Sequence, residues 1–299
     1  MRFWRRVLIG LPFLLLVLPT DSRGEALRHG QGLLWRIEAA GVADSYLFGT
    51  FHATDRDIVT LPTPVAEAFA RCDDLAFESV LDTAAKRQMT EAMLLDGGQS
   101  LDRILGPDRF GAFAAAARDH GLDPEHLKGV APWAVMWMLS LPPEELARQV
   151  NGAKVLDERL QAEGAARGKE IHGLETVPEF LAVFDGIPLA EQGRLLDATV
   201  ALHPKVREIF ARMKRAYLAR DVASILALTF EVQGGADPQA AQSFMDRVIT
   251  QRNHRMAERL VPLLGDGNLC TAIGAGHLPG DEGVLHLLEA QGFRVERIY

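Results

Sequence analysis

The chain has 299 residues, of which 48% are hydrophobic and 24% are charged, with a formal net charge of −8 at pH 7. This length is enough for a large buried core, and the acidic balance argues against a main role in binding nucleic acid. The two cysteines are too few for a disulfide scaffold or a CxxC-type metal site.

The first 24 residues have the build of a secretory signal peptide. Three arginines (positions 2, 5 and 6) precede an apolar run over residues 7–18, which is shorter than the ~20 residues of a membrane-spanning helix. We therefore expect residues 1–24 to be cleaved and residues 25–299 to form a single periplasmic or secreted domain of net charge −11, with 28 basic and 39 acidic residues. The alternative is an uncleaved signal that anchors the protein, so membrane contact is expected only through this segment.

The remaining chain alternates strand and helix signals. Predicted strands cover residues 32–39, 45–52, 75–80, 169–174, 269–274 and 293–299. Predicted helices cover 62–71, about 82–95, 107–119, 132–141, 153–167, 177–184, 188–232 with breaks, 238–264 and 282–291. Strands at both ends predict an α/β fold with a mixed or mostly parallel central sheet and a mostly helical middle at about 82–167 and 177–265.

Cys72 and Cys270 each stand beside an apolar, strand-like segment. An oxidising compartment permits a disulfide between them, if the two segments are neighbours in the sheet. Two separate buried thiols are the alternative, because the sequence does not give their separation.

Two strands end in the same pattern, Gly-x-x-His. Gly49 to His52 closes one predicted strand, and Gly274 to His277 closes another 225 residues later. In open α/β sheets, ligands bind at the carboxyl ends of the strands, and glycine lets the backbone turn there. Neutral imidazole is a ligand for Zn, Mn, Fe or Co. The alternative is two turn histidines that bond local carbonyls.

Glu78 lies in the predicted strand over residues 75–80, where alternation places it on the opposite face from Phe77, so it points inward if both faces of the sheet are covered. A buried carboxylate needs a metal, an arginine or several donors. A solvent-exposed strand end is the alternative.

Arg252 occupies the missing position of an apolar stripe on the predicted helix 238–264, between Ile249 and Met256. A guanidinium there can pair with a carboxylate or hold a substrate oxyanion, with Asn253 on the adjoining edge. The alternative is an arginine that reaches solvent from the rim of the stripe.

Three further acidic residues stand near strand or helix ends. Glu175 closes the predicted strand 169–174 and is open to a functional role. Thr176 and Glu179 have the T-x-x-E form of a helix capping box, which makes Glu179 a structural cap. Asp157, near the start of the helix 153–167, is either part of a site or a solvated surface charge.

The order of these motifs resembles the TraB/GumN family, which is similar to the Tiki-type metalloproteases and more distantly to erythromycin-esterase and haem-binding ChaN-type proteins. The likeness runs from about Gly32 to Ile298, and its most specific piece is GAGHLPGDEG at residues 274–283. The family pattern of two GxxH motifs, a glutamate and a late Arg/Asn pair falls on positions 52, 277, 78 and 252–253. Leu-Glu-Thr at 174–176 and Asp157 also match, whereas residues 177–180 depart from the Glu-Gln of many members.

The resemblance implies an exported metal-dependent hydrolase, with peptide bonds as the expected substrate. A divalent ion (Zn, Mn, Co or Fe) would be held by His52, His277 and Glu78. Glu175 or Glu78 would take the proton of the attacking water, and Arg252 with Asn253 would stabilise the oxyanion.

Two other functions remain open. The same crevice would serve a non-catalytic periplasmic binder of a haem-like ligand or envelope glycan, with apolar walls from Trp133, Met136, Trp137 and Met138. An accessory protein for polysaccharide export is the third function, and it requires no metal. The expected partner is a peptide or another small envelope substrate.

Overall fold

The computed structural model describes residues 27–80, 82–233 and 238–299. The predicted signal segment, residues 1–24, lies outside the described residues. Six strands form one sheet in the order β4-β3-β5-β2-β1-β6, with three from the first part of the chain, two from its end and β4 from the middle. The strands are β1 (Leu34–Glu38), β2 (Ser45–Thr50), β3 (Asp74–Phe77), β4 (Glu170–Gly173), β5 (Leu269–Gly274) and β6 (Arg294–Arg297).

The sheet is mixed and mostly parallel, as the sequence predicts. Strands β4, β3, β5 and β2 run parallel to one another, whereas β1 is antiparallel to both β2 and β6. Every residue of β5 is buried, which is typical of a parallel strand covered on both faces. The turn between β1 and β2 uses Gly41 at φ 81°, a left-handed conformation that favours glycine.

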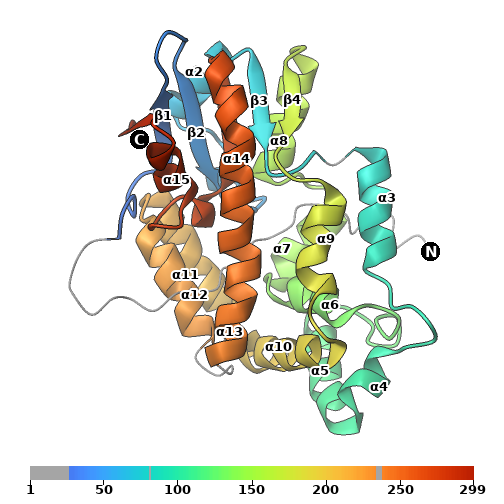
Figure 1. Ribbon diagram of the computed structural model, residues 1–299. Coiled ribbons are helices and arrows are strands. Elements are labelled where there is room, and N and C mark those ends of the chain that lie inside the picture. The colour runs from blue at the N-terminus through green and yellow to red at the C-terminus, as the bar shows by residue number, and fades with distance from the viewer. Residues whose placement is uncertain (1–26, 81, 234–237) are drawn as a thin grey trace.

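Helices surround the sheet and form a second layer beside it. The helices are α1 (Arg56–Val59), α2 (Thr63–Arg71), α3 (Thr83–Ala92), α4 (Leu101–Leu105), α5 (Pro107–Asp119), α6 (Pro132–Leu139), α7 (Pro143–Val150), α8 (Leu156–Ala166), α9 (Val177–Asp185), α10 (Leu189–Leu202), α11 (Val206–Leu218), α12 (Val222–Gln233), α13 (Pro238–Met245), α14 (Gln251–Asp266) and α15 (Val284–Ala290). Figure 1 shows α14 running lengthwise past the sheet, with α4, α5, α6 and α10 gathered at the lower right.

The helical layer has its own hydrophobic core, centred on α6. Seven of the eight residues of α6 are buried, and the Trp133 ring stacks on Phe184 with centroids 4.5 Å apart. Met136 and Met138 are also buried in this core, and Trp137 packs against it. Helix packing therefore accounts for the four side chains that the sequence offers as walls for a haem-like ligand.

The prediction of a single helix over residues 238–264 is wrong. Helix α13 ends at Met245, a π-helical turn follows over Asp246–Thr250, and α14 begins at Gln251. The wider π turn changes which side chains face the core, so Val248 is buried and Ile249 only partly so. Arg252 lies in the first turn of α14, directly after this interruption.

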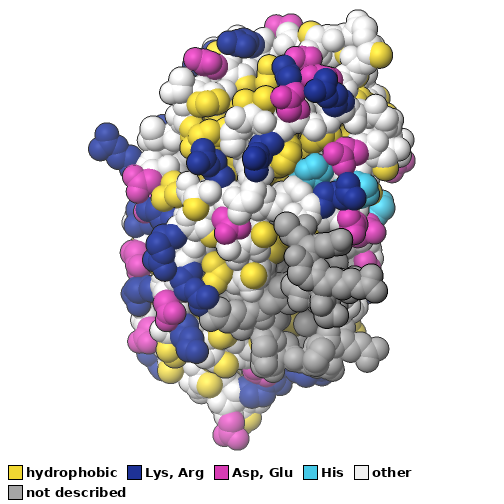
Figure 2. Space-filling model, turned by 90° about the vertical axis from the view of Figure 1, so that its left-hand side faces the viewer, with side chains coloured by type: hydrophobic (Ala, Val, Ile, Leu, Met, Phe, Trp, Pro, Cys, Tyr) yellow, Lys and Arg dark blue, Asp and Glu magenta, His cyan; other side chains and the backbone are white. Residues whose placement is uncertain are grey.

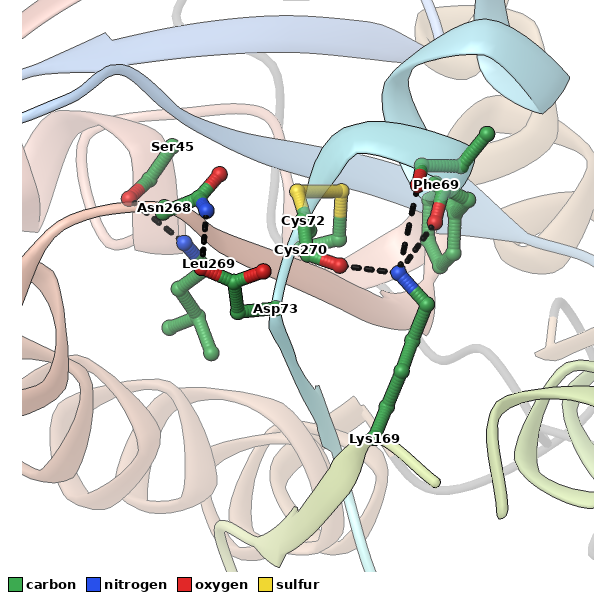
Figure 3. The surroundings of a disulfide bond; sticks show 9 residues. Ser45, Phe69, Cys72, Asp73, Lys169, Asn268, Leu269 and Cys270 are labelled. Atoms are coloured by element: carbon green, nitrogen blue, oxygen red, sulfur yellow. Dashed lines mark hydrogen bonds between the residues drawn. A yellow bond between two sulfur atoms is a disulfide. The ribbon is translucent and has the colours of Figure 1, made fainter. Parts of the chain in front are cut away.

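A disulfide joins Cys72, just before β3, to Cys270 in β5, with Cα atoms 5.6 Å apart. Strands β3 and β5 are neighbours, which is the arrangement that a disulfide between these two cysteines requires. Figure 3 shows Lys169 beside the bridge, where its Nζ donates to the carbonyls of Cys72 and Phe69, the latter at 3.0 Å. The bridge fixes the amino ends of β3 and β5.

Among the described residues, no helix is both long and apolar enough to cross a bilayer.

On the face in Figure 2, lysines and arginines are interspersed with aspartates and glutamates. Charge on this face is therefore not gathered into one basic area.

Candidate functional site

The carboxyl ends of three neighbouring strands bring His52, Glu78 and His277 together. His52 follows β2, Glu78 follows β3 and His277 follows β5, and β5 pairs with both other strands. The Nε2 atoms of His52 and His277 lie 4.0 and 3.8 Å from the same Glu78 Oε1. The side chains are 10%, 14% and 0% exposed for His52, Glu78 and His277, so the cluster is nearly closed to solvent.

The two glycines of the GxxH motifs serve different purposes. A Cβ on Gly49 would lie 2.7 Å from Leu278 Cδ1 and 3.1 Å from the Ala275 backbone, so glycine allows β2 to approach the turn after β5. The Gly274 N–H instead donates to Glu78 Oε1 at 2.6 Å. One glycine therefore provides space and the other provides a donor to the cluster.

Asp157 holds the His52 ring from the far side. Its Oδ2 lies 2.8 Å from His52 Nδ1, and its Oδ1 accepts a hydrogen bond of 2.7 Å from Thr50 Oγ1. Burial alone would lower the pKa of His52, but the Asp157 carboxylate outweighs burial and raises it. Burial alone would raise the pKa of Asp157, but His52 and Thr50 lower it. Asp157 is thus a buried partner of His52 and not a surface charge.

Asn253 holds the His277 ring in an equivalent way. Its Nδ2 donates to the Glu282 carbonyl at 2.6 Å, so its Oδ1 is the atom that faces His277 Nδ1. An amide oxygen only accepts, so the network assigns the ring proton to Nδ1 and the lone pair to Nε2. Burial and the nearby Arg252 charge hold the pKa of His277 well below its usual range, which keeps this ring neutral.

Arg252 joins the two glutamates of the site. Its Nη2 lies 2.7 Å from Glu78 Oε2 and 2.5 Å from Glu175 Oε2, and its Nε donates to Glu175 at 2.7 Å. Its side chain is 4% exposed, so it does not reach solvent from the rim of the stripe. Burial disfavours the charged guanidinium, but Glu175 and Glu78 outweigh burial and raise the pKa of Arg252. The other oxygen of Glu175 accepts from Arg255 at 2.7 Å.

Glu78 does not lie in a strand, contrary to the prediction for residues 75–80. Strand β3 ends at Phe77, so the alternation of strand side chains does not set the direction of Glu78. Its carboxylate is fixed instead by Arg252 and by the Gly274 N–H. The predicted inward orientation is observed, but for a different physical reason.

Glu179 has the structural role that the sequence predicts. The capping box with Thr176 is formed, and Arg259 binds both carboxylate oxygens at 2.6 and 2.8 Å. The Arg259 hydrogen bond lowers the pKa of Glu179 to about 2. Next to it, the Phe180 ring lies under the Arg252 guanidinium, 5.3 Å from its carbon, where the chain departs from the family pattern.

Sequence reasoning missed Glu145, a fully buried carboxylate on α7. It contacts Thr54, which lies two residues after His52. The neighbouring Glu144 is exposed, and nothing in the local sequence separates the two glutamates. Glu145 could be recognised only from its place in the fold.

The strand-end cluster contains the donor types that hold divalent ions in proteins. Two imidazoles and one carboxylate oxygen converge, and each imidazole has its other nitrogen held by an oxygen acceptor, as in most histidine metal sites. A second group in the described part of the chain, Asp74, Glu170 and His172, has its donor atoms all within 4.8 Å of one another. This second group lies toward the amino ends of β3 and β4, away from the strand ends that carry the first cluster, and the Glu170 side chain is 72% exposed.

The fold and this cluster define an α/β protein with a histidine–carboxylate site at one edge of its sheet. The chain belongs to the TraB/PrgY/gumN family, whose family model matches residues 33–297.

Curated relatives are named metalloproteases. The chain is 24% identical to Metalloprotease TIKI2 of Danio rerio, over 84% of this chain and 58% of that protein. It is 24% identical to Metalloprotease TIKI1 of Danio rerio, over 88% and 62%, and 23% identical to Metalloprotease TIKI1 of Homo sapiens, over 88% and 61%. The chain thus spans about three fifths of the length of these relatives. No solved structure matches it significantly.

Proposed function

We propose that this protein is an exported, metal-dependent hydrolase that cleaves peptide bonds, with His52, His277 and Glu78 as the ligands of a divalent ion. The observation that carries the proposal is the convergence of two imidazole Nε2 atoms on one carboxylate oxygen, at 4.0 and 3.8 Å. The relatives named metalloproteases support the metal and the peptide substrate.

The orientation of the two rings supports a cation at this point. When each Nδ1 donates its proton to Asp157 or Asn253, both Nε2 atoms present a lone pair toward Glu78. Three electron-pair donors then face one another in a site that is largely buried. A divalent cation would add positive charge at this point beside Arg252, whose Nη2 lies 2.7 Å from Glu78 Oε2 and whose Nη1 lies 3.5 Å from His277 Nε2.

The bound ion would polarise the scissile carbonyl and lower the pKa of the attacking water. Glu78 would accept the proton of that water, because its side chain is 14% exposed whereas that of Glu175 is 1% exposed. Glu175 would hold Arg252, since its two oxygens are bound by Arg252 and Arg255. Arg252 would stabilise the oxyanion, and losing such a donor typically costs about 100- to 1,000-fold in rate.

The metal content of protein purified without chelator tests the ligands. We expect near-stoichiometric metal in the wild type and its loss in the His52→Ala, His277→Ala double variant. The matched control is His172→Ala, which removes the imidazole of the second candidate group. If the double variant keeps its metal, the ligand assignment is wrong, and loss of the metal in His172→Ala would assign it to the second group instead. Peptide cleavage by the metal-loaded protein then tests the reaction.

Export is part of the proposal. The disulfide between Cys72 and Cys270 supports it, because such bridges persist in oxidising compartments. Sequencing the amino terminus of protein from the native host tests it: we expect the mature chain to begin near residue 25. A chain that keeps residues 1–24 and sediments with membranes would show an anchored protein instead.

A further inference from the structure

We propose that Glu145 on α7 is a positioning residue, which holds the segment after His52 so that the two imidazoles keep their relative placement. We call residues 51–55 the His52 loop. The proposal rests on the proposed function for its link to metal binding, and on the contacts of Glu145 alone for its link to the His52 loop.

The Glu145 carboxylate is bound by donors on every side. Its Oε1 accepts from the Thr54 backbone N–H at 2.9 Å and from Gln149 Nε2 at 2.8 Å. Its Oε2 accepts from Thr54 Oγ1 at 2.9 Å and from Arg148. The side chain is 0% exposed. A buried carboxylate is stable only when its oxygens are satisfied in this way, so the contacts depend on one another.

The hydrogen bond from the Thr54 N–H matters most for positioning, because it fixes the main chain of the His52 loop and not only a side chain. Thr54 lies two residues after His52, so a shift of this amide moves the backbone that carries the imidazole. Thr54 Oγ1 also accepts from Arg148 Nε at 2.8 Å, which ties the same residue to α7 a second time. Helix α7 therefore holds Thr54 through three hydrogen bonds, and its Arg148 also forms an ion pair of 3.6 Å with Asp55.

Helices α8 and α11 also hold residues of the His52 loop. The Phe51 ring stacks on Tyr217 of α11 with centroids 5.5 Å apart, and Asp55 accepts from Lys214 of α11 at 3.0 Å. His52 itself is held by Asp157 of α8. His277, by contrast, is held by Asn253 of α14. The relative placement of the two imidazoles thus depends on two different sets of helices, and Glu145 acts on the His52 side.

The neighbouring residue supplies a matched control. Glu144 precedes Glu145 on the same helix, its side chain is 51% exposed, and it pairs with Arg207, which is 64% exposed. Exposed ion pairs of this kind contribute little. Glu144→Gln therefore removes a carboxylate from α7 without touching the His52 loop.

The experiment compares Glu145→Gln and Glu144→Gln with the wild type, by amide hydrogen exchange of the metal-free proteins and by Zn²⁺ competition titration. In Glu145→Gln we expect exchange of the Thr54 amide to accelerate about 10-fold or more. We expect Zn²⁺ to bind about 10- to 100-fold more weakly, as for other residues that orient metal ligands. Glu144→Gln should match the wild type in both. A merely structural role would lower the unfolding midpoint and leave the Zn²⁺ affinity of the folded protein unchanged.

A folded Glu145→Gln variant with wild-type exchange at Thr54 and wild-type Zn²⁺ affinity overturns the proposal. If Glu145→Gln does not fold, Thr54→Val removes two contacts between α7 and the loop, the Oγ1 bonds to Glu145 and Arg148, and the amide of residue 54 and the Zn²⁺ affinity must show the same two changes at smaller size. If the wild type binds no Zn²⁺, the metal-site proposal fails, and exchange at Thr54 alone then decides whether Glu145 positions the loop.

Discussion

Replacing Arg252 with methionine is expected to destabilise the protein strongly, because the guanidinium stands between two buried carboxylates. Methionine keeps the apolar stem of the side chain and removes the charge, so the variant leaves little additional cavity. Glu78 and Glu175 then lose three short contacts of 2.5 to 2.7 Å with Arg252. Their side chains are 14% and 1% exposed, so water replaces the lost partner poorly.

The expected cost follows from the contacts that remain. Breaking a buried ion pair by removing one partner typically costs about 3–5 kcal/mol. Glu175 keeps Arg255 and Glu78 keeps the Gly274 N–H, which places the Arg252→Met variant at the lower end, roughly 3 kcal/mol. For a domain of this size, roughly 3 kcal/mol corresponds to roughly 6–12 °C in the melting temperature.

Thermal and urea unfolding followed by circular dichroism measure this cost. The control is Arg87→Met, because the Arg87 side chain is 77% exposed and should change stability by less than about 0.5 kcal/mol. Adding Glu175→Gln to Arg252→Met removes one of the two carboxylates that have lost Arg252. The effects of the two substitutions on the free energy of unfolding should therefore couple by about 1–3 kcal/mol. A loss below about 1 kcal/mol for Arg252→Met, or no coupling, would refute this account of the cluster.

Three further predictions test the fold. The Cys72→Ser, Cys270→Ser variant should lose up to about 5 kcal/mol, from the loop entropy of a 198-residue separation, and an unchanged urea midpoint contradicts this. Glu179 has a folded-state pKa of about 2 against 4.5, so its stabilising effect is complete above about pH 4.5 and disappears as the pH falls toward 2. Discounted for exposure, this effect is about 1 kcal/mol, and Glu179→Gln should flatten the acid side of the stability profile. Gly49→Ala should cost about 1–3 kcal/mol by overpacking, whereas Gly111→Ala, with open space around it, should not destabilise α5.

The sequence predicts the side chains that form the site better than it predicts the residues that hold those side chains in place. Both GxxH histidines could be placed at strand ends, because each motif closes an apolar run and local patterns suffice for that. The buried Arg252 could be found because it shares the buried side of α14 with Met256 and Leu260, although the π turn breaks the predicted stripe before Arg252. The capping box of Glu179 is likewise a local signal, and the structure forms it.

The supporting residues depend on tertiary neighbours that no local pattern records. From the sequence, Asp157 fits a surface charge as well as a site residue, since the first turn of a helix commonly carries an acidic residue. Only the tertiary placement of α8, beside β3 and β4, brings Asp157 within 2.8 Å of His52. Glu144 and Glu145 are identical in type and adjacent, and the orientation of α7 alone decides which one is buried.

The placement of Glu78 depends on two constraints at opposite ends of one short strand. β3 has four residues, and a slip of one residue would turn its side chains to the other face of the sheet. The disulfide fixes its amino end against β5, where Leu75 pairs with Cys270. At the carboxyl end, the Gly274 N–H of β5 donates to Glu78 itself. The same two strands that the disulfide joins therefore carry Glu78 and His277, so the bridge helps to set the distance on which a metal site at these strand ends depends.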